Sequence, residues 1–157
     1  DDYRPGYNMP DRYTQVFDED PDMKWTPDMA PHRPDIVVIY LCTNDFSTAR
    51  QPHEDVFAAR YIELLKKVKA NYGEDIPILC MASNVTPFSY DHIRYACMLS
   101  GLKNVSYMCL TKNAHNSEDE LGASWHPNYK GHKKVASCMI PYISTLTGWE
   151  MEEKPYR

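Results

Sequence analysis

The chain has 157 residues, of which 43% are hydrophobic and 12% aromatic, and this is enough apolar material for the core of one domain. The formal net charge is −5. Lysines cluster only at Lys66 to Lys69 and at Lys133-Lys134, and short runs of this kind are typical of solvated helix faces. No apolar run reaches the length of a membrane span. Neither nucleic acid nor a membrane is therefore an expected partner.

The first 34 residues are rich in proline, aspartate and aromatic residues and show little periodicity. Such a composition predicts an irregular segment, residues 1–34, packed on the domain formed by residues 35–157. One short helix is expected from Asp11 to Phe17, because Pro10 suits the first position of a helix.

A buried strand is predicted from Ile36 to Leu41, an unbroken apolar run rich in β-branched residues. It is followed by Thr43-Asn44-Asp45. In open α/β sheets the loops beyond the carboxyl ends of the strands form the ligand crevice, so Asn44 is a candidate donor of a hydrogen bond to an oxyanion. Asn also caps turns readily, which is the structural alternative. Asp45 is expected to hold the loop by accepting backbone N–H groups.

The remaining chain alternates helix and strand patterns, which is the signature of a parallel α/β sheet. We predict a partial doubly wound, flavodoxin-like sheet with about three strands, flanked by helices. The predicted elements are helices at 53–70 and 88–100, strands at 76–81 and 105–110, a long polar loop at 111–127, and a last helix from Asn128 to a stop at Gly148.

The cysteines are odd in number and mostly lie inside apolar runs, where free thiols behave as small buried hydrophobes. No pair has C-x-x-C or zinc-ligand spacing, so we predict neither a metal site nor a disulfide framework. They are Cys42, Cys80, Cys97, Cys109 and Cys138.

A second functional signal is the run from Ser124 to Asn128, which places His126 on a loop directly before an Asn-capped helix. A histidine there is a candidate general base. Trp125 beside it would line a substrate wall, or alternatively pack under the last helix. His132, one turn into the helix, is predicted to be structural.

These blocks resemble a known family. The pattern Pro-Asp-Ile-Val-Val-Ile…Thr-Asn-Asp-Phe-Ser, from Pro34 to Ser47, and the later Trp-His-Pro-Asn…Gly-His, from Trp125 to His132, are similar to the SGNH (GDSL-type) hydrolases. Within them, the chain looks like the acetyl esterases of carbohydrate esterase family two. Asn8-Met9-Pro10 and Trp25 also resemble the segment that precedes the strand in those esterases. The resemblance implies an SGNH fold without its amino-terminal strands.

The sequence departs from the family pattern at three places. No Gly-Asp-Ser block occurs, so the resemblance implies a nucleophilic serine upstream of residue 1; Ser47, Ser83 and Ser124 lack its strand-loop context. The family's acid lies three positions before the histidine, where this chain has Ala123, so the ring would need another acceptor, and a backbone carbonyl from the Trp125 region could serve. Cys42 replaces the usual glycine of the third block.

The resemblance implies a serine-histidine esterase that releases acetate from acetylated plant polysaccharide such as xylan, with His126 as base and Asn44 in the oxyanion hole. It implies no cofactor, a secreted or periplasmic location, and acetylated polysaccharide or oligosaccharide as partner, with the missing amino-terminal part of the same enzyme as a further partner. The alternatives are a non-catalytic carbohydrate-binding or interaction protein of the same fold, and a lipase-like esterase with a more apolar rim.

Overall fold

The computed structural model describes residues 7–47, 51–82, 86, 88–110, 114 and 117–152. Within these residues it contains a sheet of three strands in the order β1-β2-β3, formed by Val37–Tyr40, Ile78–Ala82 and Val105–Cys109. Both strand pairs are parallel, with Ile39 opposite Cys80 and Cys80 opposite Tyr107. The predicted parallel α/β sheet is confirmed, and each strand lies within two residues of its expected bounds.

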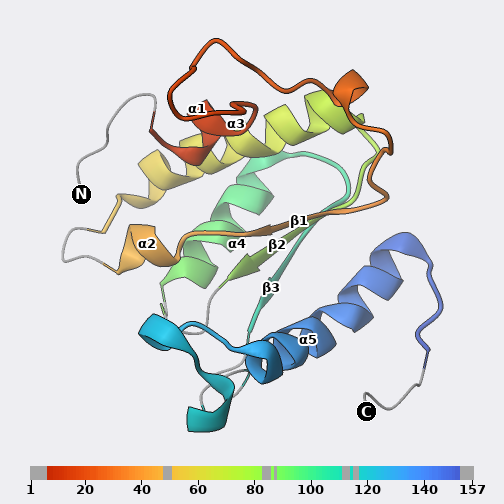
Figure 1. The fold of residues 1–157 in the computed structure, drawn as a ribbon. Helices are drawn as coiled ribbons and strands as arrows, with labels where there is room; N and C mark the ends of the chain where they lie inside the picture. The colour runs from red at the N-terminus through yellow and green to blue at the C-terminus, as the bar shows by residue number, and fades with distance from the viewer. Residues whose placement is uncertain are drawn as a thin grey trace.

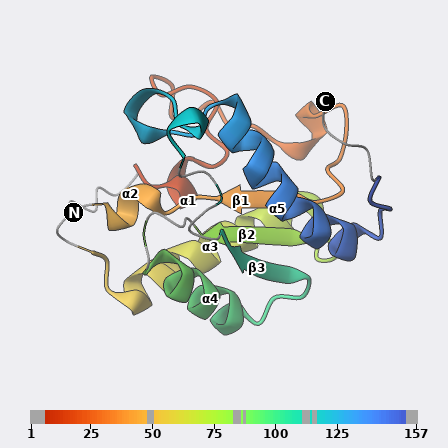
Figure 2. The ribbon, with the colours of Figure 1, turned by 90° about the horizontal axis from the view of Figure 1, so that it is seen from below.

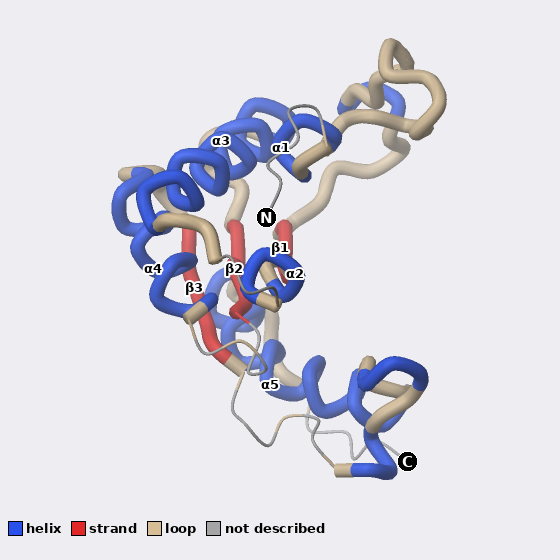
Figure 3. Tube along the Cα trace, turned by 90° about the vertical axis from the view of Figure 1, so that its left-hand side faces the viewer, coloured by secondary structure: helices blue, strands red, loops and turns tan. Residues whose placement is uncertain are grey.

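Helices cover both faces of this sheet. α3 (Glu54–Tyr72) and α4 (Ser89–Ser100) lie on one side, and α5 (Tyr129–Thr147) crosses the other, as Figure 2 shows from below the view of Figure 1. Figure 3 shows the same three layers from the side. None of the helices in the described ranges has the length and apolar character needed to cross a bilayer.

The central strand β2 holds the two layers together because its side chains alternate between them. Ile78, Cys80 and Ala82 join the cluster under α3 and α4. Leu79 and Met81 join the cluster under α5. All five residues are completely buried, and burying a large aliphatic side chain contributes about 1.5–3 kcal/mol.

Strand β1 is less well covered than β2. Ile39 faces α3 and α4 and is buried, whereas Val38 and Tyr40 point to the α5 side and remain 36% and 39% exposed. Among the described residues, β1 pairs on one edge only, with β2. The α5 side of β1 is therefore less completely covered than the same side of β2.

The amino-terminal segment packs against the domain as irregular structure with two short helices. These are α1 (Met9–Arg12) and the 3-10 helix η1 (Pro27–Met29), and an antiparallel bridge joins Gln15 to Lys24. The helix predicted from Asp11 to Phe17 was wrong in extent, because the backbone turns after Arg12 and the chain enters the bridge at Gln15. Residues 1–6 lie outside the described part of the chain.

A buried lysine joins the carboxyl-terminal end of α3 to the loops that lead into β2 and β3. Lys69 is 2% exposed, and its ammonium group donates hydrogen bonds of 2.7 Å to the carbonyl oxygens of Glu74, Ile76 and Lys103. Burial lowers the pKa of Lys69. The three bonds compensate for the loss of water around the charge.

We expect Lys69→Met to lower the free energy of unfolding by about 2–4 kcal/mol, because it leaves three carbonyl groups without their charged donor. The matched control is Lys66→Met on the exposed side of the same helix, which should change stability by less than about 0.5 kcal/mol. Urea unfolding of both variants measures the difference. Equal losses would show that the Lys69 contacts do not stabilise the fold.

Candidate active site

The first predicted site segment follows β1 directly and forms the short helix α2 (Thr43–Phe46). Asn44 and Asp45 are exposed on it, while Phe46 is buried and anchors the helix. Figures 1 and 2 show α2 at the end of the molecule toward which the strands point. Asn44 therefore lies at the carboxyl edge of the sheet, as predicted.

The residue before α2 has an unusual backbone. Cys42 adopts φ 86° and ψ −5°, in the left-handed region that favours glycine. This geometry gives a physical reason for the glycine of the resembled family at this position. Burial, together with the negative charge of Asp45, raises the pKa of the Cys42 thiol, so the thiol stays protonated near neutral pH and is a poor nucleophile.

Asp45 is exposed as a residue, but its surroundings remove enough water to raise the pKa of its carboxyl group. A hydrogen bond with its own backbone N–H opposes this rise. A second hydrogen bond runs from the Ser47 hydroxyl, which donates, to the carbonyl oxygen of Asn44, at 3.1 Å. Both contacts are local to α2.

The second predicted segment contains two short 3-10 helices, η2 (Glu118–Glu120) and η3 (Ala123–Trp125), followed by His126. Ser124 and Trp125 both have positive φ, 54° and 64°. Positive φ at two consecutive non-glycine residues is energetically costly and persists only where surrounding contacts fix the backbone. His126 is exposed, and no group among the described residues forms a hydrogen bond with its ring. The predicted acceptor that would orient the ring is thus not among these residues.

Backbone hydrogen bonds close the loop around His126. The N–H of Gly122 donates to the carbonyl of His126 at 2.7 Å, and the N–H of His126 donates to the carbonyl of Ala123 at 3.1 Å. Trp125 is 83% exposed, so the alternative that it packs under the last helix is wrong. The loop therefore presents an aromatic ring and an imidazole to solvent side by side in sequence.

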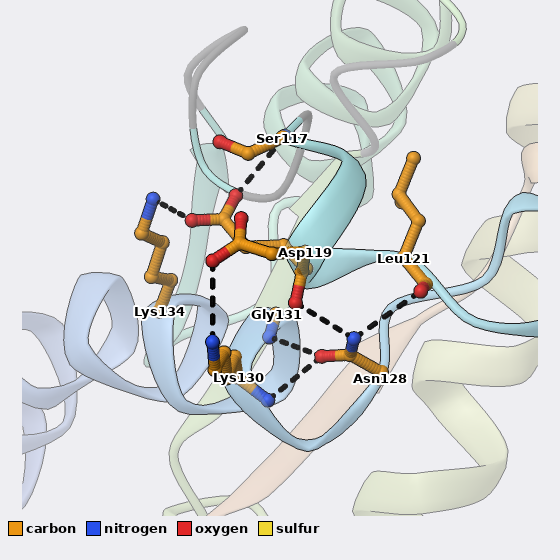
Figure 4. Close-up of polar contacts among 8 residues, drawn as sticks. Ser117, Asp119, Leu121, Asn128, Lys130, Gly131 and Lys134 are labelled. Atoms are coloured by element: carbon orange, nitrogen blue, oxygen red, sulfur yellow. Dashed lines mark hydrogen bonds and ion pairs between the residues drawn. The ribbon is translucent and has the colours of Figure 1, made fainter.

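Asn128 connects this loop to α5 through both ends of its side-chain amide (Figure 4). Its oxygen accepts from the N–H groups of Lys130 and Gly131, at 2.9 and 3.2 Å, which is the predicted helix cap. Its nitrogen donates to the carbonyls of Asp119 and Leu121, at 2.9 and 3.2 Å. The residue thus caps the helix and holds the loop with the same amide group.

Glu120 also links the loop before His126 to helix α5. It is 5% exposed, pairs with Lys134 of α5, and forms a capping box with Ser117. The hydrogen bond from Lys134 is the main cause that lowers the pKa of Glu120. We did not predict this residue from the sequence, although the Ser-x-x-Glu spacing from Ser117 to Glu120 is a recognisable capping-box signal.

The structure brings the two predicted segments to the same end of the sheet. No backbone hydrogen bond joins Asn44 to His126. Ser83 and residues 111–113 and 115–116 of the predicted loop lie outside the described residues. Within the described residues no group of three or more His, Cys, Asp or Glu side chains is placed to hold a metal ion. Two shallow surface hollows lie elsewhere, one of about 410 Å³ between η1 and the end of α3 and one beside α1.

The parallel sheet, its helical layers and the exposed segments at its carboxyl edge define a fold like that of a carbohydrate esterase. A solved carbohydrate esterase, whose active site is described as displaying divergent catalytic and non-catalytic binding functions, matches this chain with a TM-score of 0.65 and 21% identity. The match covers 80% of this chain and 40% of that chain. At this identity the likeness shows the fold alone.

A relative is also found by sequence. In an alignment 152 residues long, which covers 92% of this chain, the sequence is 27% identical to the cellulase/esterase CelE of Acetivibrio thermocellus. The matched region is 18% of the length of CelE, so this chain corresponds to a small part of that protein. No family model matches the chain.

Two substitutions of Asn128 distinguish its role as the cap of α5 from its role in holding the loop. Asn128→Asp keeps the oxygen that caps α5 but removes the two donors to the loop, whereas Asn128→Ala removes both. We expect the alanine variant to lose about 1–2 kcal/mol of stability. The aspartate variant should lose less, but should exchange the amide protons of Gly122 and His126 faster in hydrogen exchange followed by NMR. Unchanged exchange at both amides in the aspartate variant would contradict the second role.

Glu120 predicts a pH dependence of stability. Because its pKa is lowered in the folded state, its contribution is present above its ordinary value of 4.5 and is lost as pH falls through the lower folded value. Glu120→Gln should therefore have a lower free energy of unfolding than the parent at neutral pH. The difference between the two free energies should become smaller below pH 4.5. Urea unfolding at both pH values, with exposed Glu118→Gln as control, measures this. A gap that widens on acidification would contradict the assignment.

Proposed function

We propose that this chain is the carboxyl-terminal part of an SGNH-type carbohydrate esterase domain, which releases acetate from acetylated plant polysaccharide such as xylan. The nucleophilic serine lies upstream of residue 1. The glycine whose backbone N–H is a second oxyanion donor in the resembled family lies upstream as well. The protein acts in a secreted or periplasmic setting, where such polymers are met. The observation that carries the proposal is the exposed His126, held on a strained and braced loop at the sheet edge where Asn44 also lies.

The role of His126 as general base is supported by its setting. An exposed imidazole on a loop fixed by backbone bonds is free to meet a hydroxyl nucleophile, and backbone strain tends to occur where geometry serves a function. Ala123 supplies no carboxylate, so the base works as a Ser-His dyad in which a carbonyl oxygen, in the completed domain, fixes the tautomer.

In the proposed reaction, the upstream serine hydroxyl attacks the carbonyl carbon of the acetyl ester while His126 takes its proton. The amide of Asn44 donates a hydrogen bond to the oxyanion of the tetrahedral intermediate. The intermediate collapses, the sugar oxygen leaves with the proton from His126, and the serine is acetylated. Water then attacks the acetyl-serine while His126 takes its proton. The second tetrahedral intermediate collapses, His126 returns this proton to the serine oxygen, and acetate is released.

The exposed ring of Trp125 is proposed to contact the sugar. A flat apolar face with a polar N–H suits the stacking of a pyranose ring, and Trp125 precedes the base directly. The similarity to CelE, described as a cellulase and esterase, and to a carbohydrate esterase supports a polysaccharide substrate.

A non-catalytic carbohydrate-binding protein is the second candidate, and one observation favours it. Trp125 and Tyr129 are 83% and 76% exposed, and the ammonium group of Lys133 lies 4.9 Å from the centre of the Tyr129 ring. Exposed aromatic side chains offer flat apolar area on which a sugar ring can stack, and this requires no reaction. Acetate release from the natural protein distinguishes the two functions.

We expect His126→Ala in the full-length natural protein to reduce acetate release from acetylated xylan and from p-nitrophenyl acetate by about 10³-fold or more without unfolding it. The matched control is His132→Ala, a second exposed histidine six positions later on α5, which should keep at least half of the parental rate. Circular dichroism monitors folding of both variants.

Two outcomes would overturn the proposal. An unchanged rate in His126→Ala would remove this residue from the reaction. A parent protein that binds xylan but releases no acetate would exclude the esterase and leave the carbohydrate-binding function.

A further inference from the structure

Three rings meet behind α2, and they come from three different helices. Phe46 of α2 is 6% exposed, and its ring centre lies 4.8 Å from that of His92 on α4 and 5.5 Å from that of Phe57 on α3. The rings of Phe57 and His92 also meet edge to face at 5.6 Å. Figures 1 and 2 both show α2 beside the first turn of α4. His92 is therefore part of the surface on which α2 rests.

The His92 ring is itself fixed in orientation. Its Nδ1 atom lies 3.0 Å from the carbonyl oxygen of Phe88, four residues earlier. A carbonyl oxygen only accepts, so Nδ1 carries the proton of this hydrogen bond. The bond and the two edge-to-face contacts together hold the half-buried ring in one position against Phe46.

Helix α2 depends on such support because it has little of its own. It is only four residues long, and no side-chain cap holds its first turn. Isolated helices of this length are unstable, so tertiary packing must fix their position. Phe46 is the buried residue of α2, and Asn44 lies two positions before it. A shift of the Phe46 ring would therefore move Asn44 at the sheet edge.

We propose that His92 is a positioning residue, which sets the orientation of Asn44 through the ring of Phe46. The proposal rests on the proposed function in one respect: it takes Asn44 to be the oxyanion donor whose placement matters. His92 contacts neither substrate nor the reacting atoms in this account. It acts on the turnover rate by keeping α2 in one orientation.

A double-mutant cycle in the full-length natural protein tests the proposal. We expect His92→Ala to lower kcat for p-nitrophenyl acetate by between about tenfold and about a hundredfold with little change in KM, because misplacement of a transition-state donor costs rate rather than binding. In the Asn44→Ala background the same change should have almost no further effect. Tyr95→Phe is the matched control on α4: it keeps the ring, removes only the hydroxyl that donates a 3.2 Å hydrogen bond to Asp55, and should leave kcat unchanged.

Two further variants separate the ring contacts from the hydrogen bond. His92→Phe keeps a ring against Phe46 but loses the donor to Phe88, and should retain more activity than His92→Asn, which keeps a donor and loses the ring. Equal losses in the presence and absence of Asn44 would overturn the proposal, as would a kcat for His92→Ala equal to that of Tyr95→Phe.

A readout without activity keeps this test independent of the proposed function. The side-chain amide resonances of Asn44 in NMR spectra should shift and broaden in His92→Ala and stay in place in Tyr95→Phe. If the parent releases no acetate while these resonances respond as expected, the esterase proposal fails and the positioning role stands. If the parent is active but the resonances do not respond, the positioning role fails alone.

Discussion

The complete burial of β2 between two helical layers is the constraint on which the rest of the structure depends. Its side chains alternate between the cluster under α3 and α4 and the cluster under α5, so neither layer can be removed without exposing the strand. Because β1 and β3 pair with it in parallel, the segments that follow the strands emerge at one edge of the sheet. That single arrangement places Asn44 of α2 and the loop of His126 at the same end of the molecule (Figure 2).

Both candidate site segments combine backbone strain with support from elsewhere in the fold. Cys42 has a left-handed backbone before α2, and Ser124 and Trp125 have one before His126. Such conformations cost about 1–3 kcal/mol each and must be offset by surrounding contacts. At the first segment the support is aromatic packing on Phe46, and at the second it is the amide of Asn128 (Figure 4). Packing and hydrogen bonds thus fix the position of exposed polar groups that themselves contribute little to the stability of the fold.

The elements with strong local signals could be predicted from the sequence. The apolar runs gave the strands to within two residues, and Asn128 and Gly148 marked the ends of α5. The carboxyl-edge position of Asn44 followed from the parallel sheet alone. Other features depend on contacts between distant residues, which no local pattern reveals. The pairing of Glu120 with Lys134 and the packing of His92 on Phe46 are of this kind, as is the short extent of α1. The exposure of Trp125 was undecided for the same reason, because a tryptophan before a helix suits either a rim or a core.

The central claim is that His126 serves a nucleophilic serine supplied from outside this chain. Treatment of the full-length natural protein with a fluorophosphonate, followed by peptide mass spectrometry, tests this most directly, because the reagent forms a covalent bond with an activated serine. Our account predicts one modified serine upstream of residue 1, with labelling that is strongly slowed in His126→Ala. Labelling of Ser47, Ser83 or Ser124, or labelling of an upstream serine at the same rate in His126→Ala, would contradict it.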